Sequence, residues 1–67
     1  MKKNSYPVLT AANAEVGKRY AFCDGWMQVS RIYRIPEEYA AEHGLLTRWR
    51  FTATLDNDDR IDAALPS

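Results

Sequence analysis

Two β-prone runs flank the dipeptide Asp24-Gly25, and this arrangement constrains the fold more than any other feature of the sequence. Asp-Gly between such runs favours a two-residue turn, because both central residues of a type I′ turn need a positive φ. We therefore predict a β-hairpin over residues 19–35, in which Phe22 lies opposite Met27. A turn of this length also sets the register of the whole hairpin.

Alternation with a period of two then sorts the side chains of the hairpin onto two faces. The predicted core face collects most of the large apolar side chains: Tyr20, Phe22, Met27, Val29, Tyr33 and Ile35. The other face is mixed and carries Ala21, Cys23, Trp26, Gln28, Ser30, Ile32 and Arg34. On this mixed face, Trp26 and Ile32 need cover either from residues 6–16 or from a partner.

A further strand is predicted over residues 47–55, where apolar and polar side chains alternate strictly. Trp49 and Phe51 mark its buried side, and Arg48 and Arg50 project together from its polar side. The full predicted core adds five residues to the core face of the hairpin: Tyr39 of the region between the strands, Leu46 before this strand, and Trp49, Phe51 and Leu55 within it.

Between the two strand regions, Pro36 followed by Glu37 and Glu38 predicts the start of a short helix. Proline is favoured in the first helical turn, and negative charge there complements the helix dipole. Gly44 is expected to end this helix. Tyr39 and His43 lie four residues apart on one face of it, and we expect that face to pack over the apolar side of the sheet.

The predicted fold class is α+β, in one small domain spanning residues 1–67. It comprises a three-stranded antiparallel sheet with one short helix between the second and third main strands. Residues 6–9 are the candidate for a fourth strand, and residues 10–17 for a short N-terminal helix. Residues 1–5 and 57–67 are expected to be flexible, with one helical turn as the alternative for the tail.

The composition argues against several classes of function. Nine basic and nine acidic residues give a net charge of zero, so strong non-specific attraction to nucleic acid or to an anionic membrane is not expected. Cys23 is the only cysteine, and with His43 it supplies too few ligands for a closed zinc site. We therefore expect no metal and no cofactor. No run is apolar enough for a signal peptide or a membrane span, which favours a cytoplasmic protein without membrane contact.

Candidate catalytic groups are sparse. Cys23 and His43 form the one possible pair of nucleophile and base, but the sequence offers no third group to orient them. We interpret Cys23 as a small buried hydrophobe and His43 as a helix C-terminal residue, and we expect no enzymatic activity. The aspartates of residues 56–62 lack the glycine and the glutamate of a calcium loop, so we interpret them as a solvated acidic turn.

The charges are nevertheless unevenly placed, because residues 1–50 hold eight basic and five acidic residues. Arginine and tryptophan are enriched at protein-binding hot spots. The predicted binding surface combines the strand arginines with the apolar side chains of the mixed face: Trp26, Ile32, Arg34, Arg48 and Arg50.

The leading hypothesis is a small non-enzymatic protein-binding module of the accessory or inhibitor type. Phages and mobile elements encode such modules, and a host nucleic-acid-processing or transcription complex is the suggested target. Two alternatives stay open. One is a small nucleic-acid-binding module that uses the arginine-bearing sheet face. The other is a homo-oligomeric structural subunit, such as a homodimer.

Overall fold

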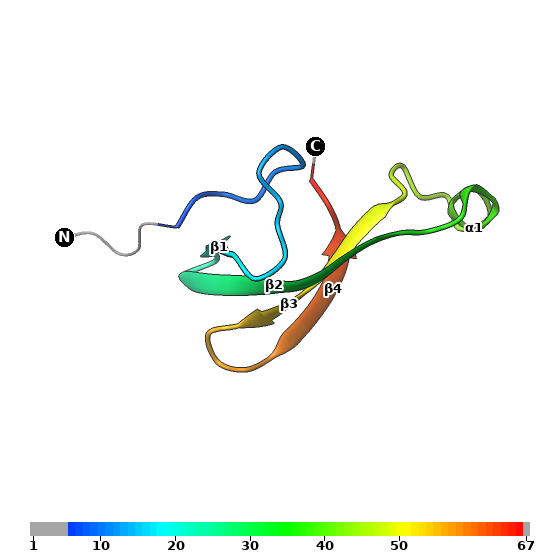
Figure 1. Ribbon diagram of the computed structural model, residues 1–67. Helices are drawn as coiled ribbons and strands as arrows, with labels where there is room; N and C mark the ends of the chain where they lie inside the picture. The colour runs from blue at the N-terminus through cyan, green and yellow to red at the C-terminus, as the bar shows by residue number, and fades with distance from the viewer. Residues whose placement is uncertain (1–5, 67) are drawn as a thin grey trace.

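The computed structural model describes residues 6–66, in which four strands form one antiparallel sheet in chain order (Figure 1). The elements are β1 (Arg19–Phe22), β2 (Gly25–Arg34), α1 (Glu37–Glu42), β3 (Trp49–Leu55) and β4 (Arg60–Ala64). The predicted antiparallel sheet is confirmed, but its fourth strand is β4 rather than residues 6–9. The flexibility predicted for residues 1–5 concerns a part of the chain outside the described residues.

The first hairpin turns one residue earlier than predicted. Phe22 pairs with Gly25, which leaves Cys23 and Asp24 as the loop. Cys23 adopts a positive φ of 51°, as the first residue of a tight hairpin turn does. The predicted pairing of Phe22 with Met27 is therefore wrong by two residues. A shift of two residues moves no side chain to the other face, so the predicted core face is retained along β1 and the first half of β2.

A β-bulge in the middle of β2 exchanges the two faces for the rest of that strand. Val29 pairs with Ala53 and Arg31 pairs with Thr52, so Ser30 is an extra residue in the ladder. The Ser30 hydroxyl lies 3.2 Å from the Thr52 carbonyl oxygen and 2.9 Å from the Thr52 hydroxyl. One inserted residue is enough to invert every later side chain, because the period of a strand is two.

The bulge overturns four predicted placements, because Arg34, predicted on the mixed face, lies on the core side, and Ile35, predicted in the core, lines a pocket on the opposite face. The other two are those of Ile32 and Tyr33. Ile32, predicted on the mixed face, pairs with Phe51 and packs against the core. Tyr33, predicted in the core, pairs with Arg50 on the opposite face. The sequence does not reveal the extra residue, because Ile32 and Tyr33 are adjacent and both are apolar enough for a core. One of them faces the core with the bulge, and the other would face it without the bulge.

The core lies between one face of the sheet and residues 6–16, which we call the cover segment. Figure 1 shows this segment looping over the side of the sheet that contains β1 and β2. Leu9 of the cover segment is only 3 % exposed. The buried cluster comprises Leu9, Tyr20, Met27, Val29, Phe51 and Ala53. Three residues predicted in the core are instead exposed: Tyr39, Leu46 and Trp49.

The cover segment turns where a short helix was predicted. Thr10 N donates to the Asn13 side-chain oxygen at 2.8 Å, and Asn13 N lies 3.3 Å from both the Thr10 carbonyl and the Thr10 hydroxyl. These bonds between side chain and backbone satisfy the amides that a helix would use. The prediction of a helix over residues 10–17 is therefore wrong, and Asn13 is the physical reason.

Helix α1 lies beyond the end of the strands, at the far side of the molecule from β1 (Figure 1). Pro36 is its N-cap, and Glu37 and Glu38 occupy its first turn as predicted. Ala40 is its one buried residue, and the core cluster contains no residue of α1. The expectation that this helix covers the apolar face of the sheet is therefore wrong. No helix within residues 6–66 combines the length and apolar character that crossing a bilayer requires.

The tail forms part of the sheet. Ile61 pairs with Ala53 and Ala63 pairs with Phe51, so both side chains reach the core face. Arg60 and Asp62 project from the opposite face. The helical turn given as the alternative for the tail is therefore wrong, because Arg60–Ala64 form β4. The flexibility expected for residues 57–67 stays a prediction.

Candidate functional site

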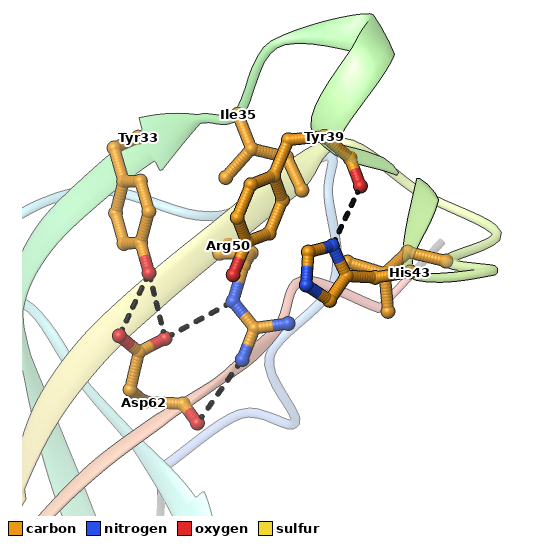
Figure 2. A pocket seen from close by; sticks show the side chains of 7 residues that line it. Tyr33, Ile35, Tyr39, His43, Arg50 and Asp62 are labelled. Carbon is orange, nitrogen blue, oxygen red and sulfur yellow. Dashed lines mark hydrogen bonds and ion pairs between the residues drawn. The ribbon is translucent and has the colours of Figure 1, made fainter. Parts of the chain in front are cut away.

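An open pocket collects aromatic, charged and apolar side chains at one end of the sheet. It lies between the outer face, meaning the sheet face opposite the core, and the arm, meaning residues 35–48 that connect β2 to β3 through α1. We call it the sheet–arm pocket, and its volume is ≈ 460 Å³. Its lining residues are Tyr33, Ile35, Tyr39, His43, Leu45, Arg50 and Asp62 (Figure 2).

Three neighbouring strands build the sheet side of the pocket. Tyr33 of β2 lies opposite Arg50 of β3, and Asp62 of β4 lies diagonally beyond Arg50. The Tyr33 hydroxyl donates to the Asp62 carboxylate, 2.7 Å from Oδ2, and Arg50 Nε donates to Oδ1 at 3.2 Å. Arg50 Nη2 also lies 3.4 Å from the Asp62 carbonyl oxygen. Figure 2 shows the three side chains pointing toward one another, so each restricts the rotamers of the other two.

Arg50 is the fixed positive charge of the sheet–arm pocket. The pKa of its guanidinium is raised above the ordinary value, first by the Tyr33 hydroxyl and then by the Asp62 carboxylate, while desolvation acts in the opposite direction. These contacts favour the charged form of a guanidinium that is already protonated at neutral pH. Because Asp62 holds it from one side, the orientation of this charge is set before any ligand arrives.

The arm supplies a stacked pair of rings and two exposed leucines. The rings of Tyr39 and His43 stack with centroids 4.1 Å apart and an interplanar angle of 22°. His43 Nδ1 lies 3.0 Å from the Tyr39 carbonyl oxygen. His43 is the C-cap of α1, so its predicted position at the helix C-terminus is confirmed. Leu45 and Leu46 follow it and are 36 % and 103 % exposed.

The pocket offers hydrogen-bond donors next to apolar walls. Arg50 donates from the floor, the Tyr39 hydroxyl and the His43 ring lie on the arm side, and Ile35 and Leu45 supply aliphatic surface. Such a combination fits a ligand group with an acceptor at its tip and an apolar stem. Within residues 6–66, no group of three or more His, Cys, Asp or Glu side chains is arranged to hold a metal ion.

Two of the five predicted binding residues lie on opposite faces of β2. Trp26 is on the outer face, partly covered by the Tyr6 ring at 6.4 Å and by the Arg19 guanidinium at 4.0 Å from its centroid. Ile32 is on the core face, as described above. The structure therefore does not join Trp26 and Ile32 into one surface.

The three predicted arginines also separate. Arg34 is exposed on the core side, where its guanidinium lies 5.5 Å from the centroid of the Trp49 ring. Arg48 Nε donates to the Ile35 carbonyl oxygen at 3.1 Å and so holds the base of the arm. Arg50 alone enters the sheet–arm pocket.

The sequence interpretation missed Asp62 and misplaced Tyr33. Asp62 was assigned to a flexible tail, although the alternation of Ile61 and Ala63 with polar neighbours is a strand signal that points to its true position. Tyr33 was misplaced by the bulge. Cys23 was interpreted as buried, but it is exposed, because it belongs to the two-residue loop of the first hairpin and not to a strand.

No family model, no curated protein and no solved structure matches this chain.

Proposed function

We propose that the protein is a small non-enzymatic protein-binding module that takes up a segment of a partner protein in the sheet–arm pocket and along the arm. The observation that supports this proposal is the pocket itself. It places an oriented arginine beside a tyrosine ring, and arginine and tyrosine are enriched at protein-binding hot spots. The proposal moves the binding site predicted from the sequence onto Arg50 and the arm.

The exposure of the arm strengthens the proposal. Leu46 is 103 % exposed, and Tyr39 and Leu45 are 48 % and 36 % exposed, on one short connection. These side chains add nothing to the core, and water-exposed apolar groups gathered in one place are typical of an interaction site. A partner that covered these side chains would remove apolar surface from water, and the transfer free energy of that surface would favour binding.

The charges of the pocket indicate the chemistry of the partner segment. Asp62 balances the charge of Arg50 from one side, and the N–H groups of Arg50 that Asp62 does not engage lie next to aliphatic and aromatic walls. An apolar segment that carries a hydrogen-bond acceptor would therefore satisfy both parts of the site. The setting we propose is that of an accessory or inhibitor protein in the cytoplasm, one that occupies a surface of a host nucleic-acid-processing or transcription complex.

Leu46→Asp should reduce partner capture by about tenfold or more, because a charge would replace an apolar side chain at the centre of the proposed contact. The measurement is affinity capture from a lysate of the source organism, with the recovered partner quantified after nuclease treatment. Leu46 makes no buried contact, so we expect the variant to unfold at the same denaturant concentration as the parent protein.

Val16→Asp is the matched control for this experiment. Val16 is 60 % exposed on the cover segment, away from the arm, and the substitution makes the same chemical change. We expect it to leave capture unchanged. Equal capture by both variants would reject the arm as the site. If the parent protein captured its partner only without nuclease treatment, a protein partner would be rejected.

A second candidate function is supported by the arginines of the outer face. The Arg19 guanidinium stacks 4.0 Å from the centroid of the Trp26 ring, and the Arg31 guanidinium stacks 4.7 Å from that of Tyr33. Planar cations and aromatic rings on an uncovered sheet face are what proteins use to bind single-stranded nucleic acid. Under this alternative, the outer face binds a single strand through its phosphates and bases.

Salt dependence tests this alternative. If about three phosphates are neutralised, log affinity for a labelled oligothymidylate should fall with log salt with a slope of about −2. Arg31→Ala should reduce both the affinity and the slope, whereas Arg34→Ala, on the other side of the sheet, should change neither. Fluorescence anisotropy at low salt measures both quantities, and no binding under those conditions would remove nucleic acid as a ligand.

A further inference from the structure

Strand β4 is an edge of the sheet, and its outer side faces no other strand within residues 6–66. The opposite edge, β1, is partly covered, because Ala21 N donates to the Pro7 carbonyl oxygen of the cover segment at 2.8 Å. An uncovered strand edge is a template for pairing with another strand. The edge of β4 can therefore accept a further strand.

The hydrogen bonds between β3 and β4 show which backbone groups point outward. Leu55 N donates to the Asp59 carbonyl at 2.7 Å, and Leu65 N donates to the Trp49 carbonyl at 2.9 Å. Hydrogen-bonded and non-hydrogen-bonded pairs alternate along an antiparallel ladder, so Ile61 and Ala63 also direct their backbone groups toward β3. The backbone groups of the alternate residues, Arg60, Asp62 and Ala64, therefore point away from the sheet.

We propose that β4 pairs antiparallel with β4 of a second copy of this chain, around a two-fold axis at Ile61. Arg60 of each protomer then lies opposite Asp62 of the other, and the two residues exchange backbone hydrogen bonds. Their side chains project from the same outer face, so each cross-strand pair is also an ion pair. The two Ile61 side chains meet on the core face, and one continuous sheet spans both protomers.

The order of charges along β4 selects a second copy as the occupant. An isologous contact requires a surface that is complementary to itself, and Arg60 followed two residues later by Asp62 has this property in the antiparallel direction. The two neighbouring registers with the same outward phase would place Asp62 against Asp62 or Arg60 against Arg60, and both are repulsive. Asp62 keeps 48 % of its side chain exposed despite its bonds to Tyr33 and Arg50, so its carboxylate can accept a further guanidinium.

A cysteine pair tests this geometry directly. In a Cys23→Ser background, Ile61→Cys should form a disulfide-linked dimer under mild oxidation, because residues in a non-hydrogen-bonded pair lie about 4.5 Å apart between Cα atoms. Ala63→Cys in the same background is the matched control. In the proposed register its two copies are about 13 Å apart, beyond the reach of a disulfide. Purified protein alone is used, so the result does not depend on the partner under Proposed function.

Sedimentation equilibrium of proteins with the native Ile61 gives an independent measurement. The parent protein should dimerise as its concentration rises from micromolar to millimolar, and Arg60→Glu should weaken the dimer by about tenfold or more by placing like charges opposite each other. Arg31→Glu makes the same charge change away from the edge and should leave the dimer intact. A parent protein that stays monomeric at millimolar concentration, or equal cross-linking of the two cysteine variants, would overturn the proposal.

Discussion

Tyr20→Ala should leave the chain unfolded at room temperature, whereas Tyr20→Phe should leave it folded but less stable. Tyr20 is 1 % exposed and is one of the two largest fully buried side chains. Truncation of a buried aromatic residue costs about 3–5 kcal/mol, and a core of this size rarely provides a larger net stability than about 3–5 kcal/mol. The alanine substitution therefore removes about as much free energy of unfolding as the protein has.

The phenylalanine variant isolates the hydroxyl. Tyr20 Oη donates to the Asn13 carbonyl at 2.6 Å and accepts from Glu15 N at 2.9 Å, so it ties the cover segment to β1. Loss of both bonds should lower the free energy of unfolding by about 1–3 kcal/mol and speed hydrogen exchange at the Glu15 amide. Denaturant unfolding followed by circular dichroism measures the first effect, and NMR-detected exchange measures the second.

Tyr33→Phe is the control for this substitution. It removes another tyrosine hydroxyl with good hydrogen bonds, but this hydroxyl is on the exposed outer face and does not contact the cover segment. We expect the Tyr33 variant to lose less stability than the Tyr20 variant and to leave exchange at the Glu15 amide unchanged. Equal effects of the two substitutions would show that the Tyr20 hydroxyl does not hold the cover segment.

The hairpin shows how far the sequence pattern reaches. Asp24-Gly25 marks the correct turn, but the loop is Cys23-Asp24, and Gly25 is the first residue of β2 and has no positive φ. A Cβ atom on Gly25 would lie 2.7 Å from Cγ of Asp56, a residue of the neighbouring turn that is distant in the sequence. Turn propensities act locally, so they cannot report this contact, although the sorting of faces up to Val29 survived the error.

Tertiary structure decided the rest of the architecture. A helix of six residues is too short to be stable alone, and its place in the fold depends on which surfaces remain uncovered. The cover segment took the apolar face through Leu9, so α1 was left at the end of the sheet with Tyr39 exposed. The candidate site depends on this position of α1. Because the arm does not cover the core face, its side chains are free to line a pocket with residues of the outer face.

The residues of the candidate site divide in the same way. Arg50 was predicted as a binding residue because the alternation along β3 is regular, and this alternation holds. The position of Tyr33 depends on the bulge in β2, and that of Asp62 depends on the pairing of β4 with β3. Both are set by pairing between segments that are distant in the sequence. The sequence therefore predicted the residue whose position follows from local periodicity and missed the two that orient it.

Deletion of Ser30 should leave the fold intact, with a loss of no more than about 2 kcal/mol in the free energy of unfolding. Ser30 is the extra residue of the bulge, so its removal lets Val29 and Arg31 keep their partners on β3 in a regular ladder. Ile32 then still faces the core. The expected loss comes from the two contacts of the Ser30 hydroxyl with Thr52 and from the altered twist of β2.

The matched control is deletion of Gln28 from the regular part of the same strand. In either frame that the shortened strand can adopt, one of Met27 and Val29, which are 5 % and 1 % exposed, must leave the core. We therefore expect this variant to be unfolded by circular dichroism and by NMR peak dispersion. An uninterrupted alternation along β2 would predict the opposite for the first deletion, because removal of Ser30 would then turn Tyr33 and Ile35 out of the core. A Ser30 deletion that is as unfolded as the Gln28 deletion would thus show that the bulge, and with it the outer-face position of Tyr33 in the sheet–arm pocket, is wrong.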